Sequence, residues 1–338
     1  MTTTTSHFSC RRVSQHAWAT VEDDRWKQYP ILYAVVSDNQ DHVVLIDSGT
    51  GSNSYLEWLK TSSPEELRKA VSTGSLTLMS THIHFDHVGE NWKFPGACLM
   101  SGAAKAFTRN SEITSLAQAF PGTHLIAFEV SRWLNDGDRI EVDPSIPLEV
   151  LQTPGHTPDS LSLFLACDRL LFIGDLLYPY TAIYLDCLGS DLNAYRASIE
   201  KLKTFVQHKS ISPAVSTLCE MLGGVNPELA KSQGVDLEQI IALCEGNLDT
   251  AIDLLLTSGA DPSKMMAQQQ SVSEIRLACG HVESSLSALP ALETVLETIR
   301  GIIEGRLHPI SIEEDSQEYA SPNRDFTFFV PKSRRTTY

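Results

Sequence analysis

The chain has 338 residues, 42% of them hydrophobic and 20% charged, so it can bury the core of one large domain or of two modest ones. Its 26 basic and 42 acidic side chains give a formal net charge of −16, which opposes a nucleic-acid partner because phosphate contacts require many lysines and arginines. No window of the sequence holds the roughly 18 consecutive apolar residues of a membrane span.

The first half of the chain predicts a structure rich in strands. Short apolar runs with β-branched residues, bounded by turn residues, are typical of buried strands. Such runs lie at 31–37, 42–47, 76–80, 97–100, 124–130, 148–153, 161–166 and 169–174, and segments of helical composition lie at 64–72, 101–108 and 111–119. The sequence Asn135-Asp136-Gly137-Asp138 is typical of a hairpin turn.

After residue 175 the pattern becomes mainly helical. Helices are predicted at 191–207, 217–222, 236–245, 247–257 and 284–304, with a strand at 274–279 and an edge strand at 326–330. A strand-rich half followed by helices predicts an α/β fold in which helices cover the outer faces of the sheets.

Residues 81–90 read THIHFDHVGE and place three histidines and an aspartate within six positions. A chain with 11 histidines in random order would contain His-x-His-x-Asp-His on the order of once in a thousand chains. His82 and His84 alternate just beyond a predicted strand, so both can face the same side of the sheet edge. Asp86 and His87 follow in the turn that opens a helix. Imidazole and carboxylate groups are ligands of zinc and similar ions, so the segment predicts a metal site.

Three further potential ligands follow apolar runs elsewhere in the chain. His156 lies in QTPGHTPDS, Asp175 in LLFIGDLLY and His281 in EIRLACGHV. Residues at strand ends deliver functional groups into a cleft lined by loops. His281 is preferred over His208 and His308 because it alone ends a strand-like run. The whole set fits two adjacent divalent ions that share a water molecule.

The motifs THIHFDHVG, TPGHTPDS, FIGDLLY and ACGHV, in this order, resemble the metallo-β-lactamase-fold hydrolase superfamily over about residues 30–305. The resemblance implies a four-layer αββα sandwich and two divalent metal ions, with zinc expected and iron or manganese as alternatives. It implies that His82, His84 and His156 hold one ion, that Asp86, His87 and His281 hold the other, and that Asp175 bridges them. Asp47, in LIDSGTG, would support these ligands from behind, although it could instead cap the turn before Gly49.

The aspartate at position 175, where lactamases of the family commonly have cysteine, favours the glyoxalase II-like and thioesterase-like branches. The cytosolic acyl-CoA thioesterase type is similar in THIHFDHVG, WLNDGDRI, GDLLY and DLNAYRASIEKL. The resemblance implies that a metal-bridging hydroxide attacks a thioester while Asp86 orients it and accepts its proton. Hydrolysis of lactones or lactams, iron-dependent persulfide dioxygenation, and a ubiquitin-binding scaffold with a vestigial site are the alternatives.

Tyr178, Tyr180 and Tyr184 follow the expected bridging aspartate. Tyr178 is the residue expected to contact substrate, and packing beneath a loop is the alternative for any of the three.

The segment 208–273 is predicted to be a helical insertion within a hydrolase domain formed by 1–207 and 274–338. Its sequence GNLDTAIDLLL resembles the last helix of ubiquitin-associated and CUE-type three-helix modules. A lid over the metal cleft is the favoured interpretation, and a ubiquitin contact through 217–258 is the alternative. Residues 265–271 are expected to form a flexible linker.

Two further patterns concern the location of the protein. The first residues, MTTTTSHFSCRRV, lack the apolar region of a secretory signal. The seven cysteines contain no C-x-x-C pair, which is typical of free thiols in a reducing compartment. We therefore expect a cytoplasmic protein that acts on a small molecule.

Overall fold

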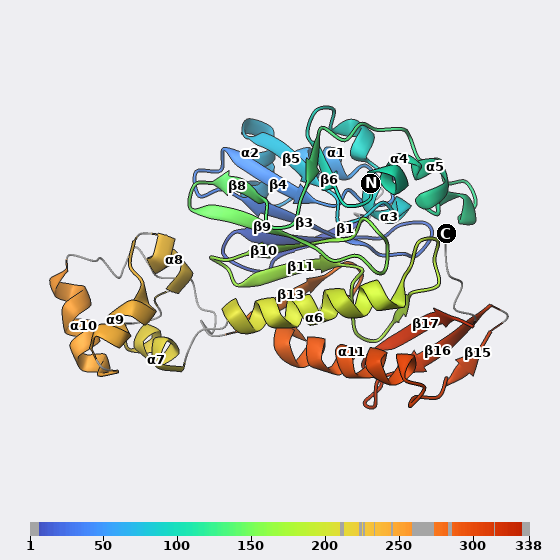
Figure 1. Cartoon of the computed structure of the whole chain (residues 1–338). Coiled ribbons are helices and arrows are strands. Elements are labelled where there is room, and N and C mark those ends of the chain that lie inside the picture. The colour runs from blue at the N-terminus through green and yellow to red at the C-terminus, as the bar shows by residue number, and fades with distance from the viewer. Residues whose placement is uncertain are drawn as a thin grey trace.

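The protein is a sandwich of two β-sheets with helices on both outer faces, as Figure 1 shows. The computed structural model describes residues 7–209, 213–222, 225, 227–232, 234–244, 246–258, 274–282, 286–313 and 315–332. The α/β sandwich predicted from the sequence is confirmed. None of the described helices is long and apolar enough to cross a membrane.

The first sheet has seven strands in chain order. They are β1 (Phe8–Arg12), β2 (Ala17–Glu22), β3 (Ile31–Val36), β4 (His42–Ile46), β5 (Ser75–Met79), β6 (Cys98–Ser101) and β7 (Arg132–Leu134). Strands β1 to β4 pair antiparallel, and β4 to β7 pair parallel. Because parallel strands end at the same edge, the residues that follow β4 and β5 emerge side by side.

The second sheet has six strands, in the order β14-β13-β11-β10-β9-β8. Their bounds are β8 (Arg139–Asp143), β9 (Ile146–Gln152), β10 (Leu161–Leu165), β11 (Leu170–Gly174), β13 (Arg276–Cys279) and β14 (Leu286–Ser287). Strands β11 and β13 are parallel neighbours although the chain between them is long. The residues that follow β11 and the residues that follow β13 are far apart in the sequence, but they therefore lie next to each other at the same edge of the sheet.

Apolar side chains fill the three interfaces between the layers. Val44 and Phe172 lie between the two sheets. The helices α1 (Tyr55–Thr61) and α2 (Glu65–Thr73) cover the first sheet, and α6 (Leu192–Lys209) and α11 (Ala288–Ile303) cover the second. The short helices α3 (Phe85–Val88), η1 (Asn91–Lys93), α4 (Lys105–Arg109), α5 (Ser111–Thr114) and η2 (Ala117–Ala119) occupy the connections.

A small third sheet stands at one end of the sandwich, in the order β12-β17-β16-β15. Its strands are β12 (Ala182–Tyr184), β15 (Ser311–Ile312), β16 (Ser316–Ala320) and β17 (Thr327–Pro331). The expectation that 326–330 forms an edge strand is wrong, because β17 pairs with β12 on one side and with β16 on the other.

Four helices follow α6 and have an apolar core of their own. They are α7 (Pro213–Met221), α8 (Pro227–Ser232), α9 (Leu237–Leu243) and α10 (Leu248–Thr257). The side chains of Asp236 and Asn247 cap α9 and α10 by accepting backbone N–H bonds. The expected linker at 265–271 lies outside the described residues, and the division at 208–273 stays a prediction.

Three local predictions differ from the structure. The expected strand 124–130 is irregular, since its apolar side chains pack onto Ile83 and Met100 instead of pairing with a neighbour. The segment 135–138 is not a hairpin turn, because it joins β7 of the first sheet to β8 of the second. The predicted strands do not include β1, β2, β7, β8, β12, β14, β15 or β16, and the helix expected from residue 101 begins only at Lys105.

Candidate metal centre

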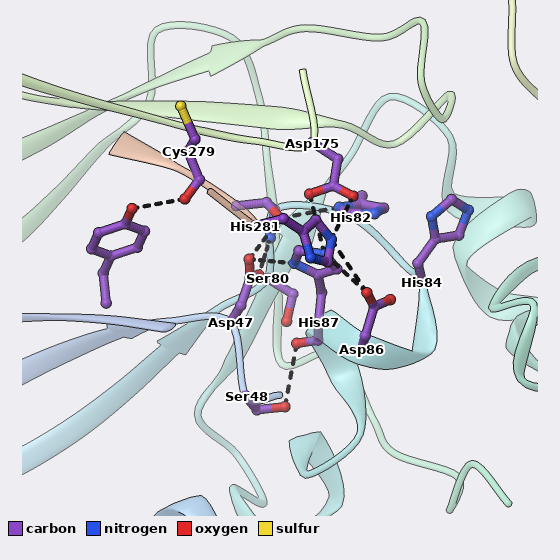
Figure 2. A network of polar contacts seen from close by, with 12 residues as sticks. Asp47, Ser48, Ser80, His82, His84, Asp86, His87, Asp175, Cys279 and His281 are labelled. Atoms are coloured by element: carbon purple, nitrogen blue, oxygen red, sulfur yellow. Dashed lines mark hydrogen bonds and ion pairs between the residues drawn. The ribbon is translucent and has the colours of Figure 1, made fainter. Parts of the chain in front are cut away.

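The seven expected ligand residues meet at the edge of the sheets where β5, β11 and β13 end. His82, His84, Asp86 and His87 come from the β5–α3 segment, His156 from the β9–β10 loop, Asp175 from the end of β11 and His281 from the end of β13. All seven are buried or nearly buried. Figure 2 shows Asp86, His87, Asp175 and His281 pointing toward one another. The structure therefore brings together every residue that the sequence proposed as a ligand.

The first group consists of His82, His84 and His156, whose donor atoms lie within 4.8 Å of one another. His84 Nδ1 and His156 Nε2 are 3.0 Å apart. His82 Nε2 is buried and has no hydrogen-bond partner among the described residues. A buried polar atom without a partner is costly, and a cation at this position would satisfy it.

The second group consists of Asp86, His87 and His281, and Asp175 lies between the two groups. Asp86 Oδ2 is 3.4 Å from His281 Nε2. Asp175 Oδ1 is 3.3 Å from His87 Nε2, and Asp175 Oδ2 is 3.1 Å from His281 Nε2 and 3.8 Å from His156 Nε2. This central carboxylate has the position that a bridge between two ions requires.

Four of the histidines are oriented through their Nδ1 atoms, one of them His82, whose Nδ1 lies 3.1 Å from the Thr81 hydroxyl. His156 Nδ1 donates to the Tyr184 carbonyl at 2.8 Å, and His281 Nδ1 donates to the Gln28 carbonyl at 2.7 Å. Because a carbonyl oxygen can only accept, each neutral ring carries its proton on Nδ1 and turns the lone pair of Nε2 into the site. His87 Nδ1 is held in the same way by Asp47 Oδ2 at 2.8 Å.

Asp47 connects the β4 and β5 ends rather than capping the turn at Gly49. Its Oδ1 accepts from the Thr81 backbone N–H at 2.7 Å, and its Oδ2 accepts from the Thr81 hydroxyl at 2.8 Å. The backbone of Asp47 has a φ of 64°, a strained value for a residue with a side chain, which its buried contacts maintain. Asp47 thus fixes the orientation of the His87 ring, and its role behind a metal ligand stays a prediction.

Burial and neighbouring charges set the protonation of the site. Burial, together with the other histidines, holds the pKa of His82 and of His84 well below the usual range, so both rings are neutral as ligands must be. Burial disfavours a charged His281, but Asp175 and Asp86 outweigh it and raise the pKa of His281 to about 9. Burial raises the pKa of Asp86, whereas His281 and His87 outweigh burial and lower the pKa of Asp175.

A cavity of about 700 Å³ opens onto these groups. Its floor contains His84, Asp86, His156, Asp175 and His281. The lining also includes the β2–β3 loop, the side chains of Phe85, Leu116 and Phe120, and several residues of the segment 178–187. Tyr178 and Tyr184 line the cavity, whereas Tyr180 is 79% exposed and does not, and the expected contact of Tyr178 with substrate stays a prediction.

Among the described residues of 208–258, none lines this cavity. Helix α6 carries the chain away from the site, and α7 to α10 stand beside the opposite end of the sheets (Figure 1). A second cavity, of about 580 Å³, lies there and is lined by Arg139 and Glu149 of the sheet and by Lys231 and Leu237 of the insertion. This arrangement gives the lid interpretation no support.

Three contributions to the site were not found from the sequence: the backbone carbonyls of Gln28 and Tyr184 and the absence of a side chain at Gly280. Gln28 and Tyr184 act through backbone carbonyls, which every residue type possesses, so their identity carries no signal. Gly280 also matters, since a Cβ added there would lie 2.2 Å from Asp175 Oδ1. The position of Gly280 directly before His281, in the sequence CGHV, was the feature from which its importance could have been predicted.

A family model of the metallo-beta-lactamase superfamily matches residues 30–209, more than half of the chain, and the chain belongs to this superfamily. Probable metallo-hydrolase YqgX of Bacillus subtilis is 27% identical over 208 residues, which are 54% of this chain and 86% of that protein. Human acyl-coenzyme A thioesterase MBLAC2 is 29% identical over 169 residues, 45% of this chain and 60% of that enzyme. The match thus spans less than two thirds of the human protein.

Two other similarities are more distant. Hydroxyacylglutathione hydrolase GloC of Haemophilus influenzae is 26% identical over 149 residues, 43% of this chain and 66% of that enzyme. The structure of TTHA1623 in a di-iron-bound form aligns with a TM-score of 0.42 and 24% identity, over 53% of this chain and 83% of that one. The protein is a probable metallo-hydrolase of this superfamily with His and Asp metal-site groups typical of its dinuclear enzymes.

Proposed function

We propose that the protein is a dinuclear metal-dependent hydrolase of thioesters such as acyl-coenzyme A. The observation that carries the proposal is the position of Asp175, whose two oxygens face His87 and His281 across a buried site. Similarity to a thioesterase and to a hydroxyacylglutathione hydrolase supports the choice of a thioester.

The donor set fits two divalent ions. His82, His84 and His156 would hold one ion, Asp86, His87 and His281 the other, and Asp175 would contact both. The unpartnered Nε2 of His82 and the inward-facing Nε2 atoms of His156 and His281 are the groups that a cation would contact, once the proton of His281 is displaced. Imidazole with carboxylate suits zinc, with iron or manganese as alternatives. When bound, two such ions polarise a carbonyl group and make water a stronger nucleophile.

Asp86 and Tyr178 line the cavity and have proposed roles in the reaction that are separate from metal binding. Asp86 lines the cavity, where its carboxylate would be placed to accept the proton of the attacking water. Tyr178 packs edge-on against His281 with ring centroids 5.4 Å apart. Burial raises the pKa of its phenol well above the usual range, so the hydroxyl stays protonated and can donate to a substrate oxygen.

A thioester suits this cavity for a chemical reason. A thiolate leaves without a strong general acid, and the cavity walls offer apolar and aromatic side chains together with Lys27 at the mouth. An ordinary amide would require protonation of its leaving nitrogen. Lactones and lactams, whose leaving groups stay attached, remain the alternative substrates of the same residues.

The deciding experiment combines metal analysis with a panel of substrates on the full chain. We expect about two divalent ions per chain, hydrolysis of acyl-CoA thioesters, and loss of turnover after chelation that zinc restores. A single iron with oxygen consumption on glutathione persulfide would instead identify a dioxygenase. Turnover of S-lactoylglutathione, a lactone or a lactam in preference to acyl-CoA would reassign the substrate.

A protein contact through 217–258, with ubiquitin as the partner to test, is a second proposal. Leu243 and Leu256 are 69% and 55% exposed on the short helices α9 and α10. Titration of the full chain with labelled ubiquitin should show binding that Leu243→Ala and Leu256→Ala together weaken, and an unchanged ubiquitin spectrum would reject this contact.

A further inference from the structure

We propose that the C-terminal sheet is part of the substrate-binding site, in which Tyr184 contacts the apolar group of the substrate and Phe329 positions Tyr184. The proposal rests on the proposed function for its choice of substrate. The matched superfamily region ends at residue 209, so strands β15 to β17 lie outside it.

Strand β12 forms one cavity wall and is held in place by β17. Tyr184 is paired with Phe329 in the parallel register of these two strands. The hydrogen bond from Leu185 N to Phe329 O, at 2.8 Å, and the bond from Tyr180 N to Asp325 O, at 2.9 Å, extend the attachment. Because β12 is an edge strand of this sheet, the C-terminal segment fixes the position of the wall.

The side chain of Tyr184 offers an aromatic surface to the cavity. Its ring stacks on Phe329 with centroids 5.2 Å apart and an interplanar angle of 10°, and Tyr184 as a whole is 48% exposed and belongs to the cavity lining. Phe85 and Phe120 line the same cavity. An apolar group that lies against these aromatic rings is removed from water, which favours its binding.

Tyr184 also contacts the metal-binding groups, but through a different part of the residue. Its backbone carbonyl accepts the His156 Nδ1 bond at 2.8 Å. The β12–β17 pairing fixes this carbonyl whatever the side chain is. A change of the Tyr184 side chain therefore alters contact with the substrate and leaves the orientation of His156 in place.

The test measures binding without turnover. S-octyl and S-ethyl thioethers of coenzyme A, which contain no cleavable ester, are titrated calorimetrically into the zinc-loaded full chain. We expect the wild type to prefer the octyl compound, and Tyr184→Ala to reduce the ratio of the two dissociation constants by about tenfold. Phe329→Leu should reduce the ratio by a smaller factor. Tyr184→Phe and Phe329→Tyr keep the rings and should keep the ratio.

Ile312→Ala is the matched control, since Ile312 lies in β15 of the same sheet, is 64% exposed and does not line the cavity. The proposal is overturned if the wild type shows no preference, or if Tyr184→Ala and Phe329→Leu keep the wild-type ratio. The proposal is also overturned if Tyr184→Ala or Phe329→Leu loses bound zinc as well as the preference for the octyl compound. Tyr184 and Phe329 would then act by holding the metal-binding groups in place and not by contact with the substrate. A preserved preference without any thioester hydrolysis would reject the proposed function alone.

Discussion

Asp47 Oδ2 and His87 Nδ1 are joined by a hydrogen bond of 2.8 Å that links the end of β4 to helix α3. Both side chains are almost completely buried. The bond turns His87 Nε2 toward Asp175, 3.3 Å away. A residue that contacts neither a substrate nor an ion thus determines where one of the proposed ligands points.

Asp47→Ala should weaken binding of the second ion by about 10- to 100-fold, because it removes the partner that fixes the His87 ring. Competition with a chromogenic zinc chelator measures this affinity. Asp249→Ala, at an exposed position of α10, is the control. Zinc affinity equal to that of the control would show that His87 does not depend on Asp47.

His84→Ala and Asp86→Ala should each lower kcat for thioester hydrolysis by about 100-fold or more, because each removes a proposed ligand and Asp86 is also the proposed proton acceptor. Circular dichroism and thermal unfolding should show that the fold persists. Turnover close to the wild-type rate in either variant would contradict the assignment of this site.

Zinc affinity should rise with pH between about 7 and 9. In chelator-treated protein, Asp175 and Asp86 outweigh burial and raise the pKa of His281 to about 9, so the ring is protonated at neutral pH. Binding of an ion must displace this proton, which costs about tenfold in affinity for each pH unit below the pKa. Asp175, Asp47 and Asp86 likewise outweigh burial and raise the pKa of His87 well above its usual range. Calorimetry in two buffers of different ionisation enthalpy should therefore detect proton release on zinc binding, and the absence of release would refute the charged state of these histidines.

The buried pair His16 and Asp168 should stabilise the fold most strongly at mildly acidic pH. His16 Nδ1 lies 2.5 Å from Asp168 Oδ1, and both side chains are buried. Burial opposes both charges, but each partner outweighs it, so the pKa of His16 is raised and that of Asp168 is lowered. The contribution is therefore complete between about pH 4 and 6.5, and is lost as the pH rises through the folded pKa of His16 or falls through that of Asp168.

Asp168→Asn should accordingly lower the free energy of unfolding by about 3 kcal/mol at pH 6 and by less at pH 9. Urea unfolding at the two pH values measures the difference. Asp38→Asn is a useful comparison, because Asp38 also contacts His16, at 3.1 Å, but is 60% exposed and should matter less. An effect of Asp168→Asn that does not vary with pH would mean that His16 is uncharged.

The side chains proposed as metal ligands could be predicted from the sequence. His82, His84, Asp86 and His87 stand in a rare spacing, and Asp175 and His281 each end an apolar run, so their residue types and positions were both informative. The support from Gln28 and Tyr184 could not be predicted because it uses backbone carbonyls that long-range packing brings into place.

The fold, like the site, has elements that could be predicted from the sequence and elements that could not. Buried strands such as β3, β4 and β11 are continuous apolar runs and could be located from composition. Strand β16 reads SQEYA and forms only because β17 lies beside it, so the central position of β17 was not foreseeable. The position of α7 to α10 in space depends on where helix α6 ends in the folded protein, and the composition of the sequence does not determine this.

Helix α6 begins beside the His156 loop, where Asp191 N donates to Gly155 O at 2.9 Å, and reaches Lys209, which pairs with Glu149 at 3.2 Å. Its 18 residues span about 27 Å. A protein held by α7 to α10 would therefore stand at one end of the molecule while small molecules enter at the other. Binding of that protein and hydrolysis of the substrate would then use separate surfaces. A copy of the chain that is bound to its protein partner could therefore turn over substrate at the same rate as an unbound copy.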